Sequence, residues 1–346
     1  MGAERQNIWL TRISMKVIER SPLGSASTVL FIIGLIPAGL FLSFYFLIAE
    51  TATVQFFYLM GLGTLVAVIG PYLLFRYDTV VFPNFIDRAK DVTPSDDDAQ
   101  IKRIGRNYKQ FFAEKYYYIC IPWTALILIA VYLNFDYYGD LGVNGYTDPV
   151  FVPYLLLCVV VGVITGMGLH MALTTVLCIR EVGDLNFTID PLHPDGLGGL
   201  SAIGYFAISS TTLFSIGSLG LPVAFDIASS GRFTGVTYFI VVIYIGTVVL
   251  SFVYPTLYIN RRAKEIRRDT LESKREQIYS YHNEIMNAQD ESDLGLLKTK
   301  LKTLRDEYDE YDRVNLYPMS PSILSKLLSS IMLPLVFLLL ETYVIS

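Results

Sequence analysis

The residues best suited to chemistry lie in one short run, at positions 190–200, which reads DPLHPDGLGGL. His193 and Asp195 are two positions apart in it, so an imidazole and a carboxylate could share a proton or hold a cation. Glycines let the backbone take positive φ and turn its N–H groups towards an anion. Three glycines follow the aspartate, namely Gly196, Gly198 and Gly199.

Three interpretations of this loop stay open. It is a phosphate- or metal-binding loop, a tight turn whose Pro and Asp residues cap the next helix, or a gate or coupling loop against the helical hairpin expected in residues 259–321. One histidine and one aspartate are too few ligands for a metal site. We therefore expect no resident metal, no cofactor and no catalytic residue. A membrane enzyme that uses His193 and Asp195 is the least favoured class of function.

The other reactive side chains are few and scattered. The cysteines, Cys120, Cys158 and Cys178, fall in or beside apolar segments, at spacings that predict neither a metal site nor a disulfide framework. His170 lies near the middle of an apolar segment, either as a hydrogen-bonded histidine or as a proton or ligand site. Secondary transporters place several ionisable groups at mid-membrane, so their scarcity here disfavours that class.

The composition is that of a membrane protein. Of the 346 residues, 53% are hydrophobic and 17% are charged, and the mean hydropathy is +0.45. The net charge of −5 disfavours a nucleic-acid partner, because phosphate backbones are bound by basic surfaces. We expect membrane lipid as the surrounding partner.

Seven apolar segments are long enough to cross about 30 Å of hydrocarbon as helices. They are residues 26–49, 54–75, 116–135, 150–177, 201–225, 233–258 and 323–345. This pattern predicts an all-α, polytopic helix bundle with about seven transmembrane helices. We expect a six-helix bundle in residues 1–258, a helical hairpin in 259–321 and a C-terminal transmembrane helix in 322–346.

The distribution of Lys and Arg predicts the orientation. These residues crowd the 76–115 and 259–321 connections, whereas the 135–149 connection has none and carries three acids. The positive-inside rule therefore predicts a cytoplasmic N-terminus, a cytoplasmic hairpin and an external C-terminus in the cell membrane. The basic run 261–268 would lie at the lipid headgroups.

The charged island 259–321 has two helical patterns, and the second carries a heptad seam. Its apolar positions alternate by three and four, which is typical of a coiled coil. They are Leu294, Leu297, Leu301, Leu304, Tyr308 and Tyr311. The seam closes either an antiparallel hairpin within one chain or an assembly that also meets other subunits.

The last apolar segment has features of a pore-lining helix. Hydroxyls repeat at helical spacing before an apolar stretch, and an acid follows it; the alternative is a simple membrane anchor. The pore-lining candidates are Ser322, Ser325 and Ser329 for the wetted part, Leu333, Phe337 and Leu340 for a constriction, and Glu341 for the outer mouth.

The order of these parts resembles the seven-transmembrane ion channel superfamily of the insect odorant and gustatory receptors. The resemblance covers the whole chain as topology, and Thr342-Tyr343 matches part of the family's C-terminal motif. It implies a homo-oligomer, a tetramer, whose cytoplasmic helices assemble and whose last helix lines a cation pore. The HPDGxGGL string resembles one in uncharacterised prokaryotic multi-pass membrane proteins, which implies a structured loop.

Two classes of function lead from the sequence. The first is an oligomeric cation channel whose C-terminal helix lines the pore. The second is a membrane sensor or scaffold that acts through its cytoplasmic hairpin without conduction.

Overall fold

The computed structural model describes residues 7–48, 53–90, 98–185, 189–193, 195, 198–230, 233–287 and 291–314. Throughout these ranges the regular structure is helical, with no strand, which confirms the predicted all-α class. The N-terminal elements are α1 (Trp9–Ile18), α2 (Ser25–Thr28), η2 (Val29–Leu35), α3 (Ile36–Ile48), α4 (Val54–Arg76), η3 (Tyr77–Val81) and α5 (Phe82–Ala89). The following elements are α6 (Asp98–Lys115), α7 (Tyr117–Leu133), α8 (Phe135–Asp140), α9 (Phe151–Gly183), α10 (Ser201–Phe214), η6 (Ser215–Gly220), α11 (Leu221–Ser230), α12 (Thr234–Asn287) and α13 (Glu291–Arg313).

Six helical stretches within the described residues are long and apolar enough to cross a membrane, and they indicate an integral membrane protein. They are Ser25–Leu47, Val54–Ala89, Asp98–Leu133, Phe151–Gly183, Ser201–Ala228 and Thr234–Asn287. Each corresponds to one of the first six predicted segments. The seventh predicted segment, 323–345, lies outside the described residues.

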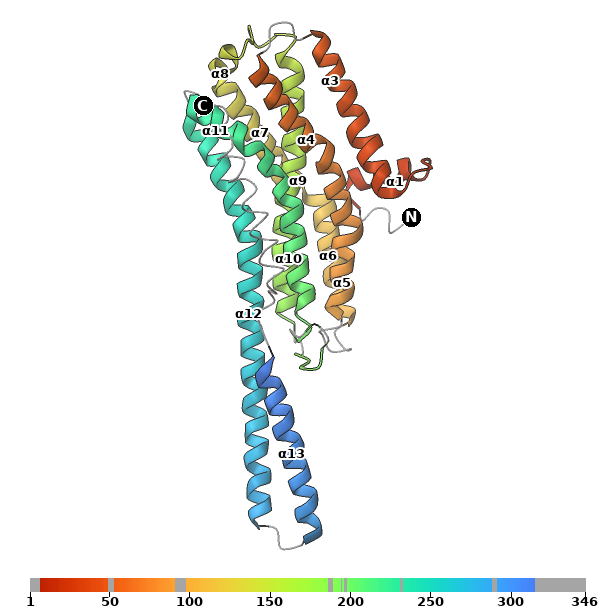
Figure 1. The fold of residues 1–346 in the computed structure, drawn as a ribbon, viewed down its shortest axis with the longest axis vertical. Coiled ribbons are helices and arrows are strands. Elements are labelled where there is room, and N and C mark those ends of the chain that lie inside the picture. Colours follow the sequence, from red (N-terminus) through yellow and green to blue (C-terminus); the bar gives the residue numbers. More distant parts are fainter. Residues whose placement is uncertain are drawn as a thin grey trace.

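Several helices continue well past their apolar segments at one end of the bundle. The α4–η3–α5 stretch and the α9 helix have 36 and 33 residues, so each is about 50 Å long, against about 30 Å of hydrocarbon. The parts of α4–α5, α6–α7 and α9 that extend beyond their apolar segments lie at the end from which α12 projects (Figure 1). We call this the hairpin end. Hydropathy marks where a helix is apolar, so it does not show where the helix stops.

Two apolar clusters hold the bundle together. One lies towards the hairpin end and includes Tyr77, Phe85, Phe112 and Phe206, with the Phe85 and Phe206 rings stacked at 4.1 Å between centroids. The other is built from aromatic residues near the opposite end, among them Phe56, Tyr138 and Tyr154. Burial of large aromatic side chains at both ends stabilises the packing of α4, α7 and α9.

The hairpin is the most prominent feature of the molecule. α12 has 54 residues, which corresponds to about 80 Å of continuous helix. α13 runs back beside its projecting half (Figure 1), and we call α13 together with residues 266–287 of α12 the hairpin. The sequence anticipated two helical patterns in this region, and the second helix begins at Glu291.

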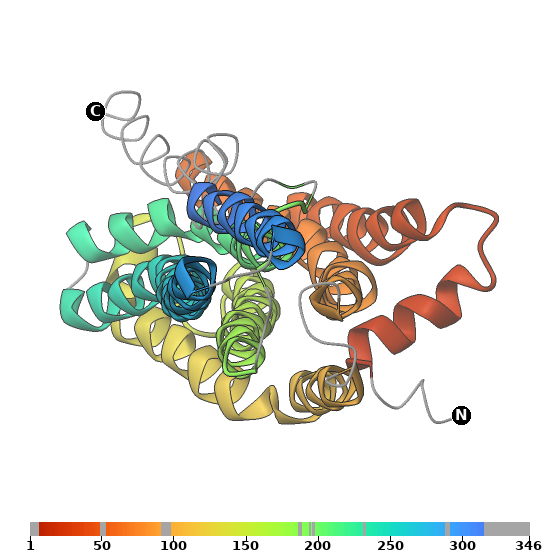
Figure 2. The same ribbon diagram turned by 90° about the horizontal axis from the view of Figure 1, so that it is seen from below.

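An additional short helix, α1, was not predicted from the sequence. It is ten residues long and lies with α3 at the periphery, away from α12, as Figure 2 shows. The carboxylate of Asp78, 2% exposed, accepts a hydrogen bond of 3.2 Å from the backbone N–H of Ile8. An acidic side chain near the N-terminus of a helix is stabilised by the positive end of the helix dipole. Together with the hydrogen bond, this holds the start of α1 against η3, which carries Asp78.

Candidate functional site

The base of the hairpin brings the C-terminal end of α9 and the loop 189–200 that follows it together with two segments far along the chain. These segments are the middle of α12 and the end of α13. We call this region the junction and describe it from the loop outwards.

The loop is organised by its two aspartates. Asp195 accepts hydrogen bonds from the backbone N–H groups of Gly199, at 3.0 Å, and Ser201, at 3.1 Å. These N–H groups lie at the start of α10, so the carboxylate caps that helix. Asp190 accepts from the N–H of Leu192 at 2.9 Å and sets the turn that precedes it.

The two residues singled out for chemistry are in contact. His193 Nδ1 lies 2.8 Å from an Asp195 oxygen, and the two side chains are 27% and 12% exposed. The same carboxylate already accepts two backbone hydrogen bonds. This geometry supports the interpretation of the loop as a capped turn. No group of three or more metal-ligating side chains occurs in the part of the chain that the structure describes.

Gly198 brings the loop against the end of the hairpin. Its φ of +66° and that of Gly199, +91°, lie in the left-handed region that favours glycine. A Cβ on Gly198 would lie 2.6 Å from Ile189 and 3.3 Å from the side chain of Val314. Val314 directly follows α13, so the loop and the hairpin touch, as the coupling interpretation requires.

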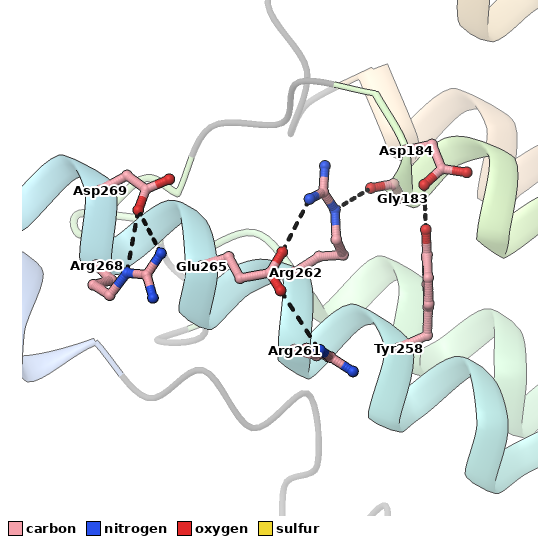
Figure 3. A network of polar contacts seen from close by, with 8 residues as sticks. All are labelled: Gly183, Asp184, Tyr258, Arg261, Arg262, Glu265, Arg268 and Asp269. Atoms are coloured by element: carbon pink, nitrogen blue, oxygen red, sulfur yellow. Dashed lines mark hydrogen bonds and ion pairs between the residues drawn. The ribbon is translucent and has the colours of Figure 1, made fainter.

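The end of α9 is bound to α12 by polar groups. Tyr258 donates a hydrogen bond to the carboxylate of Asp184, and Arg262 Nε donates to the carbonyl of Gly183 at 3.4 Å (Figure 3). Carbonyls at a helix C-terminus lack intrahelical partners and attract cations. Glu265 lies 3.0 Å from Arg262 Nη1 and 3.5 Å from Arg261 Nε. These contacts tie α12 to the bundle where it leaves it.

A second set of contacts closes the hairpin just beyond this tie. Arg267 pairs with Asp312 at 2.9 Å and donates to the carbonyl of Val314 at 3.3 Å. Lys274 pairs with Glu307 and lies 5.2 Å from the centre of the Tyr311 ring. Arg267 therefore holds the end of α13 beside the loop, because the Val314 side chain faces Gly198.

The predicted seam lies along the half-buried side of α13. Leu294, Leu297, Leu301, Leu304, Tyr308 and Tyr311 are all partly buried, and most positions between them are exposed. On α12, the half-buried positions include Ile278, Tyr281 and Ile285. The two stripes belong to helices that run side by side (Figure 1). Within one chain the seam is thus half-covered rather than fully buried.

A cavity of about 150 Å³ lies inside the bundle, apart from the junction. Its walls are almost entirely apolar and come from α4, α7, α9, η6, α11 and α12. Thr237 lines it, is 3% exposed, and has a hydroxyl without a partner among the described residues. Trp123 also lines it, and its indole N–H donates to the hydroxyl of Thr165 at 2.9 Å. A cavity of this size and polarity suits a small, largely apolar molecule.

The remaining predicted residues divide into two groups. His170 is 1% exposed, lies 3.1 Å from the carbonyl of Phe111 on the polar helix α6, and stacks on Phe112. It is thus a hydrogen-bonded histidine within the bundle, and the three cysteines are buried and free. The other group lies outside the described residues: Gly196, Ser322, Ser325, Ser329, Leu333, Phe337, Leu340 and Glu341.

The sequence reasoning missed the tie between α9 and α12 and the internal cavity. Arg262 was noticed only as part of a basic run, and nothing local singles out Asp184 or Tyr258. Their pairing depends on the crossing of two long helices, which a linear pattern does not reveal. Comparisons with known protein families, curated proteins and solved structures found no match to this chain.

Proposed function

We propose that this protein is a membrane sensor or scaffold that binds a small apolar molecule within its bundle and acts through its projecting hairpin. One observation carries the proposal: α12 lines the cavity with its first turns and forms half of the hairpin with its last. A displacement of its wall residues Thr237, Val241 or Tyr244 would therefore reach the hairpin through a single helix.

Two features of α12 lie between the cavity and the hairpin. They are a proline inside the helix and the contacts that tie the helix to the end of α9. Pro255 lies inside α12, between the cavity and the tie to α9. A proline removes one backbone hydrogen bond and favours a bend at that turn. Beyond it, Tyr258 and Arg262 rest on the end of α9. A movement of the cavity-lining part of α12 would then pivot about these contacts and displace the hairpin.

The first experiment uses benzyl alcohol as the probe, because its ring fits an apolar cavity and its hydroxyl can pair with Thr237. We expect it to raise the melting temperature, since a ligand that binds only the folded state stabilises it. We also expect it to change hydrogen–deuterium exchange in α13. Ala224→Leu, which fills the cavity wall, should abolish both effects, and Val242→Phe on the exposed face of α12 should leave both unchanged.

A matched pair of arginines tests the connection itself. Arg262 and Arg261 both pair with Glu265, but in the part of the chain that the structure describes it is Arg262, and not Arg261, that donates to the end of α9. Arg262→Ala should keep the rise in melting temperature and lose the response in α13. Arg261→Ala should behave as the wild type. A stabilising probe that leaves α13 exchange unchanged in the wild type would refute the sensor and leave only a scaffold.

A cation channel is the second candidate, and the placement of Val314 favours it. The hairpin holds this residue against the loop only eight positions before Ser322, so the junction would set where the predicted last span begins. We expect the reconstituted oligomer to conduct cations in bilayer recordings. Leu333→Ser or Phe337→Ser should raise the basal current by wetting a constriction, and Glu341→Lys should lower the preference for cations. A folded, oligomeric protein that never conducts would refute this candidate.

A further inference from the structure

An apolar groove lies where α1 and the first membrane helix meet α4 and α9. It has a volume of about 510 Å³ and is lined by α1, the η2–α3 helix, α4 and α9. Its lining is almost wholly apolar. Apart from Trp9, Thr64 is the one lining residue whose side chain carries a hydrogen-bonding group. The Thr64 hydroxyl donates to the carbonyl of Met60 at 2.7 Å.

Two contacts hold the η2–α3 helix against α4 beside the groove. Gly34 of η2 packs directly on α4, where an added Cβ would lie 2.7 Å from the carbonyl oxygen of Val68. Nearer the opposite end of the bundle, the Phe46 and Phe57 rings stack at 4.9 Å between centroids. Leu156 and Val160 of α9, which line the groove, remain 60% and 39% exposed. The groove therefore opens sideways from three helices that are apolar enough to cross a membrane.

α1 places basic groups beside this opening. Trp9 lines the groove, and Arg12 and Lys16 follow it by three and seven positions, so the three side chains share one face of the helix. Both basic residues are exposed. A short helix with a tryptophan, exposed apolar residues and lysine or arginine is typical of a segment that lies in the membrane interface. Asp78 fixes its start through the N–H of Ile8.

We propose that the groove is a binding site for one anionic phospholipid. An acyl chain occupies the space between α3, α4 and α9, and the phosphate of the headgroup binds Arg12 and Lys16. The apolar walls match the chain, because an apolar groove at membrane depth is filled by hydrocarbon rather than water. The two cations match the headgroup, because anionic lipids are attracted by basic residues at the membrane surface.

The two tryptophans of the chain make this site measurable. Trp9 lines the groove and Trp123 lines the internal cavity, so Trp123→Phe leaves Trp9 as the single reporter. The full chain with this change is placed in vesicles that contain phosphatidylglycerol or phosphatidylcholine with brominated acyl chains. Bromine quenches indole fluorescence at short range, so quenching of Trp9 reports occupancy of the groove.

We expect brominated phosphatidylglycerol to quench Trp9 at a mole fraction about fivefold lower than brominated phosphatidylcholine, which corresponds to the attraction of about one basic residue. Arg12→Gln with Lys16→Gln should remove this preference. Lys102→Gln with Arg103→Gln, exposed basic residues on α6, should retain it. Equal quenching by the two lipids in the starting protein would show contact with bulk lipid alone and would overturn the proposal.

A filled groove gives the second arm of the test. Val160→Phe should reduce quenching by both lipids, and Leu250→Phe on the exposed side of α12 should not. If Val160→Phe does not fold, Ala38→Leu on α3 fills the groove from the other wall and carries the same expectation. Undiminished quenching in a folded filled variant would exclude an acyl chain from the groove.

Discussion

At the scale of single residues, Asp195 connects the loop to the helix that follows. Its two oxygens accept hydrogen bonds from Gly199 and Ser201, and one of them also contacts His193. The carboxylate thus supports the start of α10 and the shape of the loop that meets Val314. The imidazole of its neighbour His193 contacts the carboxylate and accepts a hydrogen bond from the Asp195 N–H at 3.3 Å. It supports the loop but does not reach the N–H groups at the start of α10, so we expect it to contribute less to stability.

Replacing Asp195 separates capping from charge. Asp195→Ala removes the acceptor for both backbone N–H groups, so we expect a loss of about 1–2 kcal/mol in the free energy of unfolding. Asp195→Asn keeps an accepting oxygen and should cost less than half of that. His193→Ala should cost least. Thermal unfolding of the purified protein measures the order of the three variants, and an equal cost for the alanine and asparagine variants would contradict the capping role.

For this loop, the sequence could predict the local chemistry but not the contacts with distant parts of the chain. The proximity of His193 and Asp195 and the need for flexible glycines follow from spacing alone, and the positive φ of Gly198 and Gly199 agrees with that expectation. The partner of Gly198 could not be predicted, because Val314 reaches it only after α12 and α13 have folded back. For the same reason, the contact of Tyr258 with Asp184 had no local signal.

At the scale of elements, α12 is unusual because one helix belongs to two environments. Its first half packs one face, with residues such as Val241 and Phe252, into the bundle, and its second half is rich in charged residues beside the half-buried stripe that faces α13. The sequence predicted both halves as helices, the first from its apolar composition and the second from its periodicity. For the other five stretches, hydropathy placed the limits away from the hairpin end within a few residues. It missed the hairpin-end limits of the α4–α5, α6–α7 and α9 stretches, because less apolar turns continue these helices there.

The seam on α13 provides the prediction for this scale. Leu301 and Leu304 are half-buried against α12. Changing both to Asp places carboxylates at an apolar contact, so we expect a loss of about 1–3 kcal/mol in hairpin stability. Lys298→Asp with Lys302→Asp, at exposed positions of the same helix, is the matched control.

Two measurements divide the roles of the seam. Loss of exchange protection in α13 at unchanged particle size would assign the seam to packing within one chain. A smaller particle in size-exclusion chromatography would assign it to contacts between subunits as well. Unchanged exchange and unchanged size in the double variant would refute both roles.

At the scale of the whole molecule, the structure separates two ends of different chemistry. The hairpin end carries most of the basic residues, among them Arg103, Arg106, Arg180 and Arg267. The opposite end is rich in aromatic residues and is closed by Asp226, which accepts hydrogen bonds from Gln55 and Tyr137. Six apolar helices indicate that the molecule lies in a membrane. From the asymmetry of its basic residues, the positive-inside rule predicts that the hairpin end lies on the cytoplasmic side.

Labelling of single cysteines tests that direction. Thr147→Cys lies in the connection before α9, and Asn287→Cys lies at the tip of the hairpin, at the two ends of the molecule. The native cysteines are buried, so the wild type should give little background. In intact cells, a membrane-impermeant maleimide should label Thr147→Cys. It should label Asn287→Cys only after the membrane is permeabilised, because the positive-inside rule predicts a cytoplasmic hairpin from the basic connections. Labelling of Asn287→Cys in intact cells would place the hairpin outside. The anionic-lipid site beside Arg12 would then face the external leaflet, and the hairpin would meet extracellular partners instead of cytoplasmic ones.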